Sequence, residues 1–217
     1  MQRAINSSAS ALPMVALTHL LEGTVPMAYH DVRKPSMAPD IMPAKEISLK
    51  DAKQDKLFYV VANVVICRES DGRCLILKRS MREKVHPGKY AVPGGKLEWA
   101  QLDLMHPTRV NGDVLDFEDA VETLLAREAM EEAGVRIGKT LQYVNSVAFV
   151  RPDGIPVLLV KFAAAYAGGD VRLEQGAFDA FAWVNAEEAK AYDCIKGIRE
   201  EVAQAIRLVC PARAAAV

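Results

Sequence analysis

The stretch REAMEEAGV, residues 127–135, places three glutamates and an arginine within six consecutive positions. It closes a longer run, from about residue 117 to residue 133, that is rich in strong helix formers and contains no glycine or proline. Gly134 then supplies a natural C-terminal stop, because glycine readily adopts the left-handed conformation that ends many helices. The sequence therefore predicts a helix over about 117–133 that ends at Gly134.

The three glutamates of this helix share one side of it. On a wheel of about 100° per residue, Glu131 and Glu132 lie on either side of Glu128. Small and apolar residues fall on the opposite side, and we expect the helix to pack through them. They are Ala126, Ala129, Met130 and Ala133.

Such an acidic cluster has two interpretations. Like charges four positions apart destabilise a helix by roughly 0.2–0.5 kcal/mol per pair, and a bound cation would reverse that effect. Carboxylate oxygens are the hard ligands that Mg²⁺ or Mn²⁺ prefers, and Arg127 could orient them through bidentate hydrogen bonds. The alternative is a solvent-facing acidic stripe with Arg127 as its ion-pair partner.

The surrounding sequence favours the first interpretation. Upstream of the helix, HPGKYAVPGGKLE at residues 86–98 is a turn-rich loop that should touch a short strand. Its end, from Gly94 to Glu98, and residues 127–135 together resemble the Nudix box, G-x5-E-x7-R-E-apolar-x-E-E-x-G-apolar. Residues 127–135 satisfy the second half of that motif in full.

The first half of the motif departs from the family pattern. Asp119 stands where the family has a glutamate eight positions before Arg127, and residues 99–118 fill a gap that usually holds two residues. This eighteen-residue insertion is tolerable because the entropy cost of closing a loop grows slowly with its length. Its Trp99, His106 and Arg109 are compatible with a flap near the substrate, although His106 is better explained as a solvated loop residue.

The resemblance implies an α/β (α+β) fold, a Nudix-like α-β-α sandwich with a mixed sheet. The chain pattern agrees with it, because β-branched and aromatic runs separated by turn residues predict a hairpin around Asp71-Gly72 and three later strands. A terminal helix should begin near Ala186 after an Asn185 cap and be bent or divided at Gly197. We predict a loosely ordered extension at 1–56, a domain at 57–208 with the insertion at about 99–118, and a tail at 209–217.

The resemblance also implies the chemistry. Members hydrolyse a nucleoside diphosphate joined to another group and use a divalent cation, Mg²⁺ or Mn²⁺. Carried onto this chain, the metal ligands are Glu128, Glu131, Glu132 and the Gly95 carbonyl. Arg127 would orient the acids, and Glu131 could act as the base that activates water.

Other site residues lie outside the box. A second acid from a later loop is the alternative base, with Glu174 as the first candidate and Asp179 as the second. Lys96 and Arg79 are candidate contacts to the substrate phosphates. Four aromatic residues could stack on a base, although aromatic residues at strand spacing are more often core. They are Tyr90, Phe149, Phe178 and Trp183.

The resulting hypothesis is a pyrophosphohydrolase for nucleoside triphosphates or nucleotide sugars. One alternative is a Nudix-like domain that only binds a ligand as a sensor or interaction module. The retained glutamates argue against it, whereas the insertion and Asp119 favour it. A second is an isoprenoid diphosphate isomerase, which no cysteine in a motif context supports.

Composition limits the partners of the chain. A formal charge of −1 leaves no basic excess for polymeric nucleic acid, so we expect a small-molecule substrate, with a homodimer as a possible assembly. The sequence contains no run of about eighteen apolar residues, so it predicts no membrane-spanning helix. The four cysteines form no CxxC pair and indicate a reduced, cytoplasmic protein, with Cys67 and Cys74 interpreted as plain strand residues rather than a disulfide.

Overall fold

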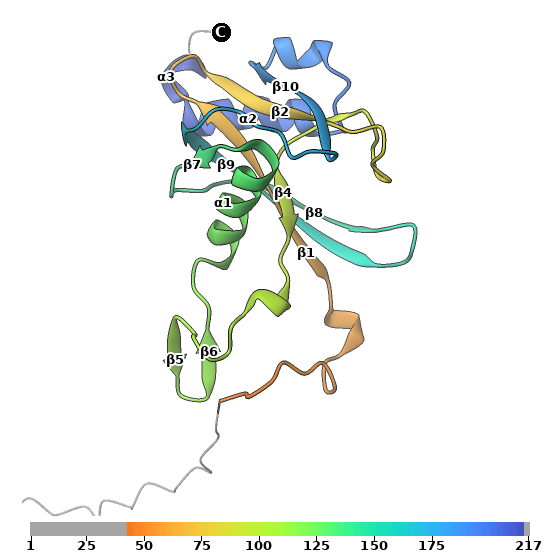
Figure 1. The fold of residues 1–217 in the computed structure, drawn as a ribbon, viewed down its shortest axis with the longest axis vertical. Helices are drawn as coiled ribbons and strands as arrows, with labels where there is room; N and C mark the ends of the chain where they lie inside the picture. The colour runs from red at the N-terminus through yellow and green to blue at the C-terminus, as the bar shows by residue number, and fades with distance from the viewer. Residues whose placement is uncertain (1–42, 215–217) are drawn as a thin grey trace, which may run out of the picture. The chain divides into compact units, whose positions relative to one another are not determined.

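A mixed sheet forms the centre of the domain (Figure 1). The computed structural model describes residues 43–214, so most of the predicted extension at 1–56 lies outside the described residues. The main path of the sheet runs β10-β2-β1-β9-β7, while β3 pairs with β2, β4 with β1 and β8 with β9. The β1–β9 pairing is parallel and the other pairings are antiparallel. The strands are β1 Tyr59–Arg68, β2 Arg73–Arg79, β3 Tyr90–Ala91, β4 Gly94–Lys96, β7 Arg136–Ile137, β8 Gln142–Val150, β9 Pro156–Gly168 and β10 Phe178–Val184.

The two principal helices, α1 (Ala120–Ala133) and α2 (Ile198–Val209), pack on separate apolar clusters. Alternation along β1 decides which residue joins which cluster, because successive side chains of a strand point to opposite faces. Val64 joins the cluster that contains the α1 residues, and Val65 joins the one that contains the α2 residues. The α-β-α sandwich with a mixed sheet is thus confirmed.

The packing face of α1 differs from the predicted one. The helix begins at Ala120 rather than near residue 117, and it ends as expected, with Gly134 in the left-handed region at φ 68°. Its buried residues are Leu124, Leu125, Ala129 and Ala133. The prediction was wrong for Ala126 and Met130, which are exposed, Met130 by 45%. The buried face includes Leu124 and Leu125, which lie one turn before Glu128 and Ala129. It is therefore rotated toward the glutamates relative to the predicted face.

The insertion is built from a short turn and a small hairpin. The turn is the 3₁₀ helix η2 (Trp99–Gln101), and the hairpin pairs β5 (Arg109–Asn111) with β6 (Val114–Asp116). Figure 1 shows this hairpin beyond the N-terminal end of α1. The side chain of His106 is 82% exposed and contacts Asp103 at 2.8 Å, which confirms its interpretation as a solvated loop residue.

The C-terminal region is divided at Gly197 as predicted, but the helix predicted from about Ala186 is wrong, because only a 3₁₀ helix forms before Gly197. Asn185 Oδ1 accepts hydrogen bonds from the backbone N–H groups of Glu187 and Glu188, at the start of the 3₁₀ helix η3 (Glu188–Ala191). Gly197, at φ 100°, separates that segment from α2, and a short helix α3 (Pro211–Ala214) follows.

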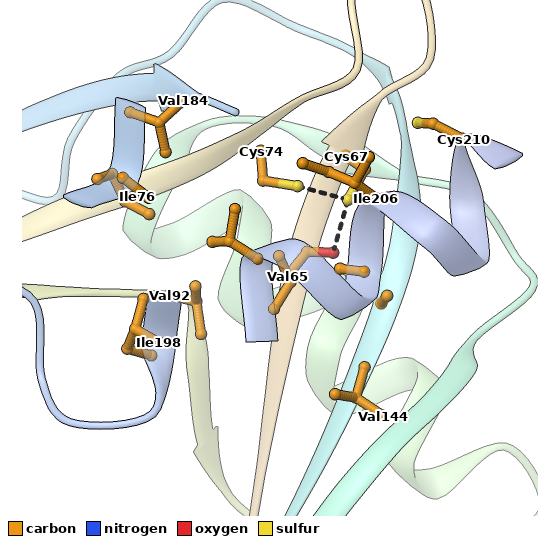
Figure 2. Close-up of a cluster of buried hydrophobic side chains, with 14 residues drawn as sticks. Val65, Cys67, Cys74, Ile76, Val92, Val144, Val184, Ile198, Ile206 and Cys210 are labelled. Carbon is orange, nitrogen blue, oxygen red and sulfur yellow. Dashed lines mark hydrogen bonds between the residues drawn. The ribbon is translucent and has the colours of Figure 1, made fainter. Parts of the chain in front are cut away.

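Cys67 and Cys74 face each other across the β1–β2 hairpin and confirm the strand interpretation. They are register partners, both fully buried, with their sulfur atoms 2.7 Å apart as free thiols (Figure 2). Burial raises the pKa of the Cys74 thiol well above its ordinary value, so this side chain stays protonated. These thiols pack as small apolar groups beside Val65 and Ile76.

A buried ion pair joins the sheet to α2. Lys161 on β9 donates to Glu201 on α2, and their side chains are only 11% and 2% exposed. The second carboxylate oxygen of Glu201 has no hydrogen-bond partner among the described residues. Removing one member of such a pair leaves an uncompensated buried charge, which costs roughly 3–5 kcal/mol.

We expect Glu201→Leu to lower the free energy of unfolding by about 3–5 kcal/mol, because Lys161 is then buried without its partner. The double variant Lys161→Met/Glu201→Leu should lose less than the single one, since it buries no charge. Urea denaturation checks both. Lys190→Met is the control, because it breaks an exposed pair with Glu187 (64% and 67% exposed) and should cost under about 1 kcal/mol. If Glu201→Leu lowered the free energy of unfolding as little as the control does, the role of Glu201 as the partner of a buried charge would be contradicted.

Candidate active site

The carboxylates of Glu128 and Glu132 lie between α1 and the glycine strand β4. The backbone N–H of Gly94 donates to Glu132 Oε2 at 3.0 Å. A Cβ placed on Gly95 would lie 2.3 Å from Glu128 Oε1, so only glycine leaves room for that carboxylate in its present position. Glu131, by contrast, is exposed. The two part-buried glutamates therefore do not form a solvent-facing stripe.

Arg127 holds Glu128 from the solvent side. Its Nη2 donates to Glu128 Oε1 at 2.9 Å, and the two side chains are 39% and 15% exposed. The guanidinium also faces the side-chain amide of Gln101 in the insertion. A guanidinium only donates, so the amide oxygen must be the atom turned toward it; that oxygen then accepts from Nη1 at 3.0 Å and Nη2 at 3.3 Å. Gln101 was not among the predicted site residues, although it stands six positions after Gly95, where the G-x5-E pattern has its glutamate.

Burial and mutual repulsion shift both carboxyl groups toward their protonated forms. Desolvation raises the pKa of Glu132 to about 8, with further increases from the charges of Glu128 and Glu174. The Gly94 hydrogen bond and the charge of Arg79 oppose this rise. Desolvation also raises the pKa of Glu128, against the opposing effect of Arg127. Negative charge has thus been gathered in a place where water solvates it poorly.

The loop before β10 brings Glu174 to the same place. Its backbone N–H donates to the Glu132 carbonyl at 3.0 Å, and the Arg172 N–H donates to the Ala133 carbonyl at 2.8 Å. The charge of Glu174 raises the pKa of both Glu128 and Glu132. Asp179, the second candidate, lies on β10 and is exposed. Among the two later acids, Glu174 is the one placed beside the cluster.

The two basic candidates differ in their surroundings. Arg79 ends β2, donates to the Val85 carbonyl at 2.8 Å and pairs with Glu83, and its charge acts on Glu132. Lys96 follows Gly95 directly at the end of β4 and is exposed. Both basic side chains therefore come from elements that adjoin the carboxylates.

The four aromatic candidates divide between core and surface. Phe178 is buried, and Tyr90 and Trp183 pack against the two apolar clusters, which confirms the core interpretation for these three. Phe149 on β8 is 43% exposed and does not belong to either cluster.

A hollow of about 1030 Å³ opens next to the end of β4, a feature that the sequence did not predict. Its walls come from the segment before β1, the strand end at Lys96 and the insertion. Representative lining residues are Leu57, Phe58, Leu97, Trp99, Leu102 and Phe117.

Comparison with known proteins agrees with this arrangement. The family profile described as NUDIX domain matches residues 58–205. The chain belongs to the NUDIX family. A nucleoside triphosphatase, NudI, from Klebsiella pneumoniae (strain 342) is 26% identical over 147 residues, which cover 63% of this chain and 89% of that protein. The chain is thus a member of a hydrolase family, and the matched span includes the motif at residues 127–135.

Solved structures support the fold. A MutT NUDIX hydrolase from Burkholderia pseudomallei superposes with a TM-score of 0.51 at 20% identity and covers 69% of this chain and 98% of its own. A NUDIX family hydrolase from Clostridium perfringens gives a TM-score of 0.50 at 17% identity, with 70% and 98% covered. At this identity the likeness concerns the fold alone.

The donor set of the Nudix box suits a divalent cation. Within residues 43–214 no three His, Cys, Asp or Glu side chains already stand in an arrangement that could hold a metal ion. The chemistry still fits, because Glu128 and Glu132 supply hard oxygen ligands whose crowded charge a cation would neutralise.

Within residues 43–214, no helix is long and apolar enough to cross a membrane.

The raised pKa of Glu132 predicts a pH-dependent stability in the metal-free protein. Its ordinary value is 4.5 and its folded value about 8, so the folded state binds the proton more tightly. The stabilisation is complete below pH 4.5 and is lost as the pH rises toward 8. We therefore expect the melting temperature, measured in chelator, to fall across this range and Glu132→Gln to flatten the decline. The control Glu122→Gln, at an exposed position in the first turn of α1, should keep the wild-type slope; an equal slope in Glu132→Gln would contradict the assignment.

Proposed function

We propose that this protein hydrolyses a diphosphate linkage in a nucleoside diphosphate derivative, with Mg²⁺ or Mn²⁺ as cofactor. The observation that carries the proposal is the pair of part-buried carboxylates, Glu128 and Glu132, pressed against Gly94 and Gly95. Burial and the charge of Glu174 disfavour their ionised forms. Such an arrangement costs stability unless a positive ligand compensates it.

The metal ligands in this proposal are Glu128, Glu131, Glu132 and the Gly95 carbonyl. A bound divalent ion supplies charge neutralisation for the diphosphate and acidifies water. Arg127 keeps Glu128 oriented through its hydrogen bond at 2.9 Å. Glu131 is exposed beside the two part-buried acids and is therefore free to turn toward a bound substrate.

The reaction requires a base. A water oxygen forms a bond to one phosphorus, the bond from that phosphorus to the bridging oxygen breaks, and the other phosphate leaves. The water proton passes to a carboxylate, and Glu131 and Glu174 are the two candidates. The backbone of Glu174 is held by its hydrogen bond to the Glu132 carbonyl, Glu131 lies on α1, and both side chains are exposed.

Lys96 and Arg79 are the proposed contacts to the substrate phosphates. Both side chains are positively charged and come from elements that adjoin the carboxylates, so they can balance the phosphate charge. A nucleoside triphosphate is the first substrate to test, because the related NudI protein carries that activity in its name. Nucleotide sugars form the second group.

Hydrolysis should collapse in Glu131→Gln, which keeps the size of the side chain but removes its charge. A panel of nucleoside triphosphates, nucleotide sugars and dinucleoside polyphosphates is incubated with Mg²⁺ or Mn²⁺, and the release of phosphate, pyrophosphate or nucleoside monophosphate is measured. We expect kcat to fall at least about 100-fold if this carboxylate handles the proton or the metal.

The matched control is Glu122→Gln, on the same helix but outside the Nudix box, which should stay within about 2-fold of wild type. If the wild type turns over no member of the panel with either metal while one compound binds, the catalytic proposal fails and a ligand-binding role replaces it.

A further inference from the structure

The proposed mechanism makes no use of the hollow of about 1030 Å³ beside the end of β4. One of its walls is the segment before β1, which includes Leu57 and Phe58, and another is the chain that follows Gly95, at residues 96–100. Figure 1 shows the segment before β1 and the β5–β6 hairpin at the same end of the domain, beyond the start of α1. The hollow lies where these segments meet β4.

Part of the wall consists of residues that the motif does not specify. Between Gln101 and Arg127 the motif leaves seven residues, whereas this chain has residues 102–126 there. Leu102 and Leu115 come from this longer stretch, and both line the hollow. The segment before β1 also lies outside the motif. The hollow is therefore a feature of this chain rather than of the Nudix box.

We infer that the hollow binds a hydrocarbon group attached to the diphosphate, so that the substrate class is a nucleoside diphosphate esterified to an apolar alcohol. The inference rests on the proposed function for the position of the diphosphate, at the Gly95 carbonyl. Lys96 follows Gly95 directly in the chain and lines the hollow. A group that extends from a diphosphate held at Gly95 therefore has the hollow next to it.

The side chains of the wall suit such a group. Phe58, Tyr59 and Trp99 are 47%, 49% and 55% exposed, and all three line the hollow. Single exposed apolar residues need no explanation, but several gathered on one concave surface mark a ligand site. The volume also fits, because pockets for ligands of drug size measure on the order of 300–1,000 Å³. A hydrocarbon bound here removes apolar surface of both partners from water.

The charges of the wall are nearly balanced, which disfavours a second anionic group in the hollow. The charged lining residues are Lys96, Glu98 and Asp116. Asp116 pairs with Arg109 at 2.8 Å, so Lys96 and Glu98 are left as opposite charges. Further phosphate groups would find no excess of positive charge there. The group that enters the hollow is therefore uncharged.

Hydrolysis of this substrate needs no further reactant. The oxygen of water bonds to one phosphorus, the bond from that phosphorus to the bridging oxygen breaks, and the water proton passes to a carboxylate. The products are a nucleoside monophosphate and an alkyl phosphate.

A chain-length series tests the site without turnover. Methyl, butyl and octyl monoesters of methylenediphosphonate carry a CH₂ group in place of the bridging oxygen, so that linkage cannot be hydrolysed. Their Kd is measured by isothermal titration calorimetry with the full chain and Mg²⁺. Each methylene group that becomes buried lowers Kd roughly 4-fold. We expect the octyl ester to bind at least about 100-fold more tightly than the methyl ester.

The double variant Phe58→Ser/Trp99→Ser should reduce this gain to under about 10-fold, because it removes two apolar walls. Both side chains are about half exposed, so the fold should be kept, which the melting temperature checks. The matched control is Met105→Ala, at an 82% exposed residue of the insertion outside the hollow, and it should keep the full gain.

Two results would overturn the inference. One is a wild type that gains nothing with chain length, or an equal gain in the wild type, the double variant and the control, which would indicate adsorption elsewhere. The other is a wild-type dimer that binds no ester more tightly than the methyl one and that Phe58→Ser/Trp99→Ser dissociates. That result would assign the hollow to a second copy of the chain.

Kinetics separate this inference from the proposed function. With methyl, butyl and octyl esters of adenosine diphosphate and Mg²⁺, kcat/KM should rise with chain length, mainly through a lower KM. If the diphosphonates show the chain-length dependence but no nucleotide is hydrolysed, the proposed function fails and the hydrocarbon site stands. If nucleotides are hydrolysed but chain length leaves Kd unchanged, the hydrocarbon site alone fails.

Discussion

The close contact between the strand Gly94–Lys96 and the second half of α1 is the constraint on which the site depends. Without a Cβ at Gly95, the strand approaches the helix until Glu128 lies against its backbone, while the Gly94 N–H reaches Glu132. Two carboxylates are thereby enclosed beside main chain rather than exposed to water. The same contact sets the pKa of Glu132, the position of Glu128 and the distance from the helix to the sheet.

The sheet separates this polar arrangement from a second one on its other side. Toward α1, the enclosed acids repel one another and lack a full complement of positive charge. Toward α2, Glu201 is even more deeply buried but has Lys161 as a partner. A buried carboxylate that is paired within the fold serves the fold, whereas one left under-compensated is available to a ligand.

Much of the architecture could be predicted from local sequence, and the failures have a common physical origin. The helix end at Gly134, the strands after it and the break at Gly197 follow from backbone preferences that act within a few residues. The prediction of the packing face of α1 was wrong because residues were assigned to the buried or the exposed side by their polarity. In the structure Glu128 and Glu132 turn toward the sheet and Met130 turns toward solvent. The apolar hollow could not be predicted, since it depends on contacts between segments far apart in the chain. Gln101 was missed because the motif position six residues after Gly95 holds glutamine instead of glutamate. The domain limits, the roles of the site residues and a homodimer stay predictions.

The backbone hydrogen bonds from Arg172 and Glu174 to the last carbonyl groups of α1 have a consequence for cooperativity. Helix ends ordinarily fray, but here the final turn of α1 is hydrogen-bonded to the loop that carries Glu174, a candidate base. Local unfolding of this last turn would therefore also break the hydrogen bond that holds the backbone of Glu174. The last turn of α1 and the loop that carries Glu174, which are distant in the chain, are thus coupled in local unfolding.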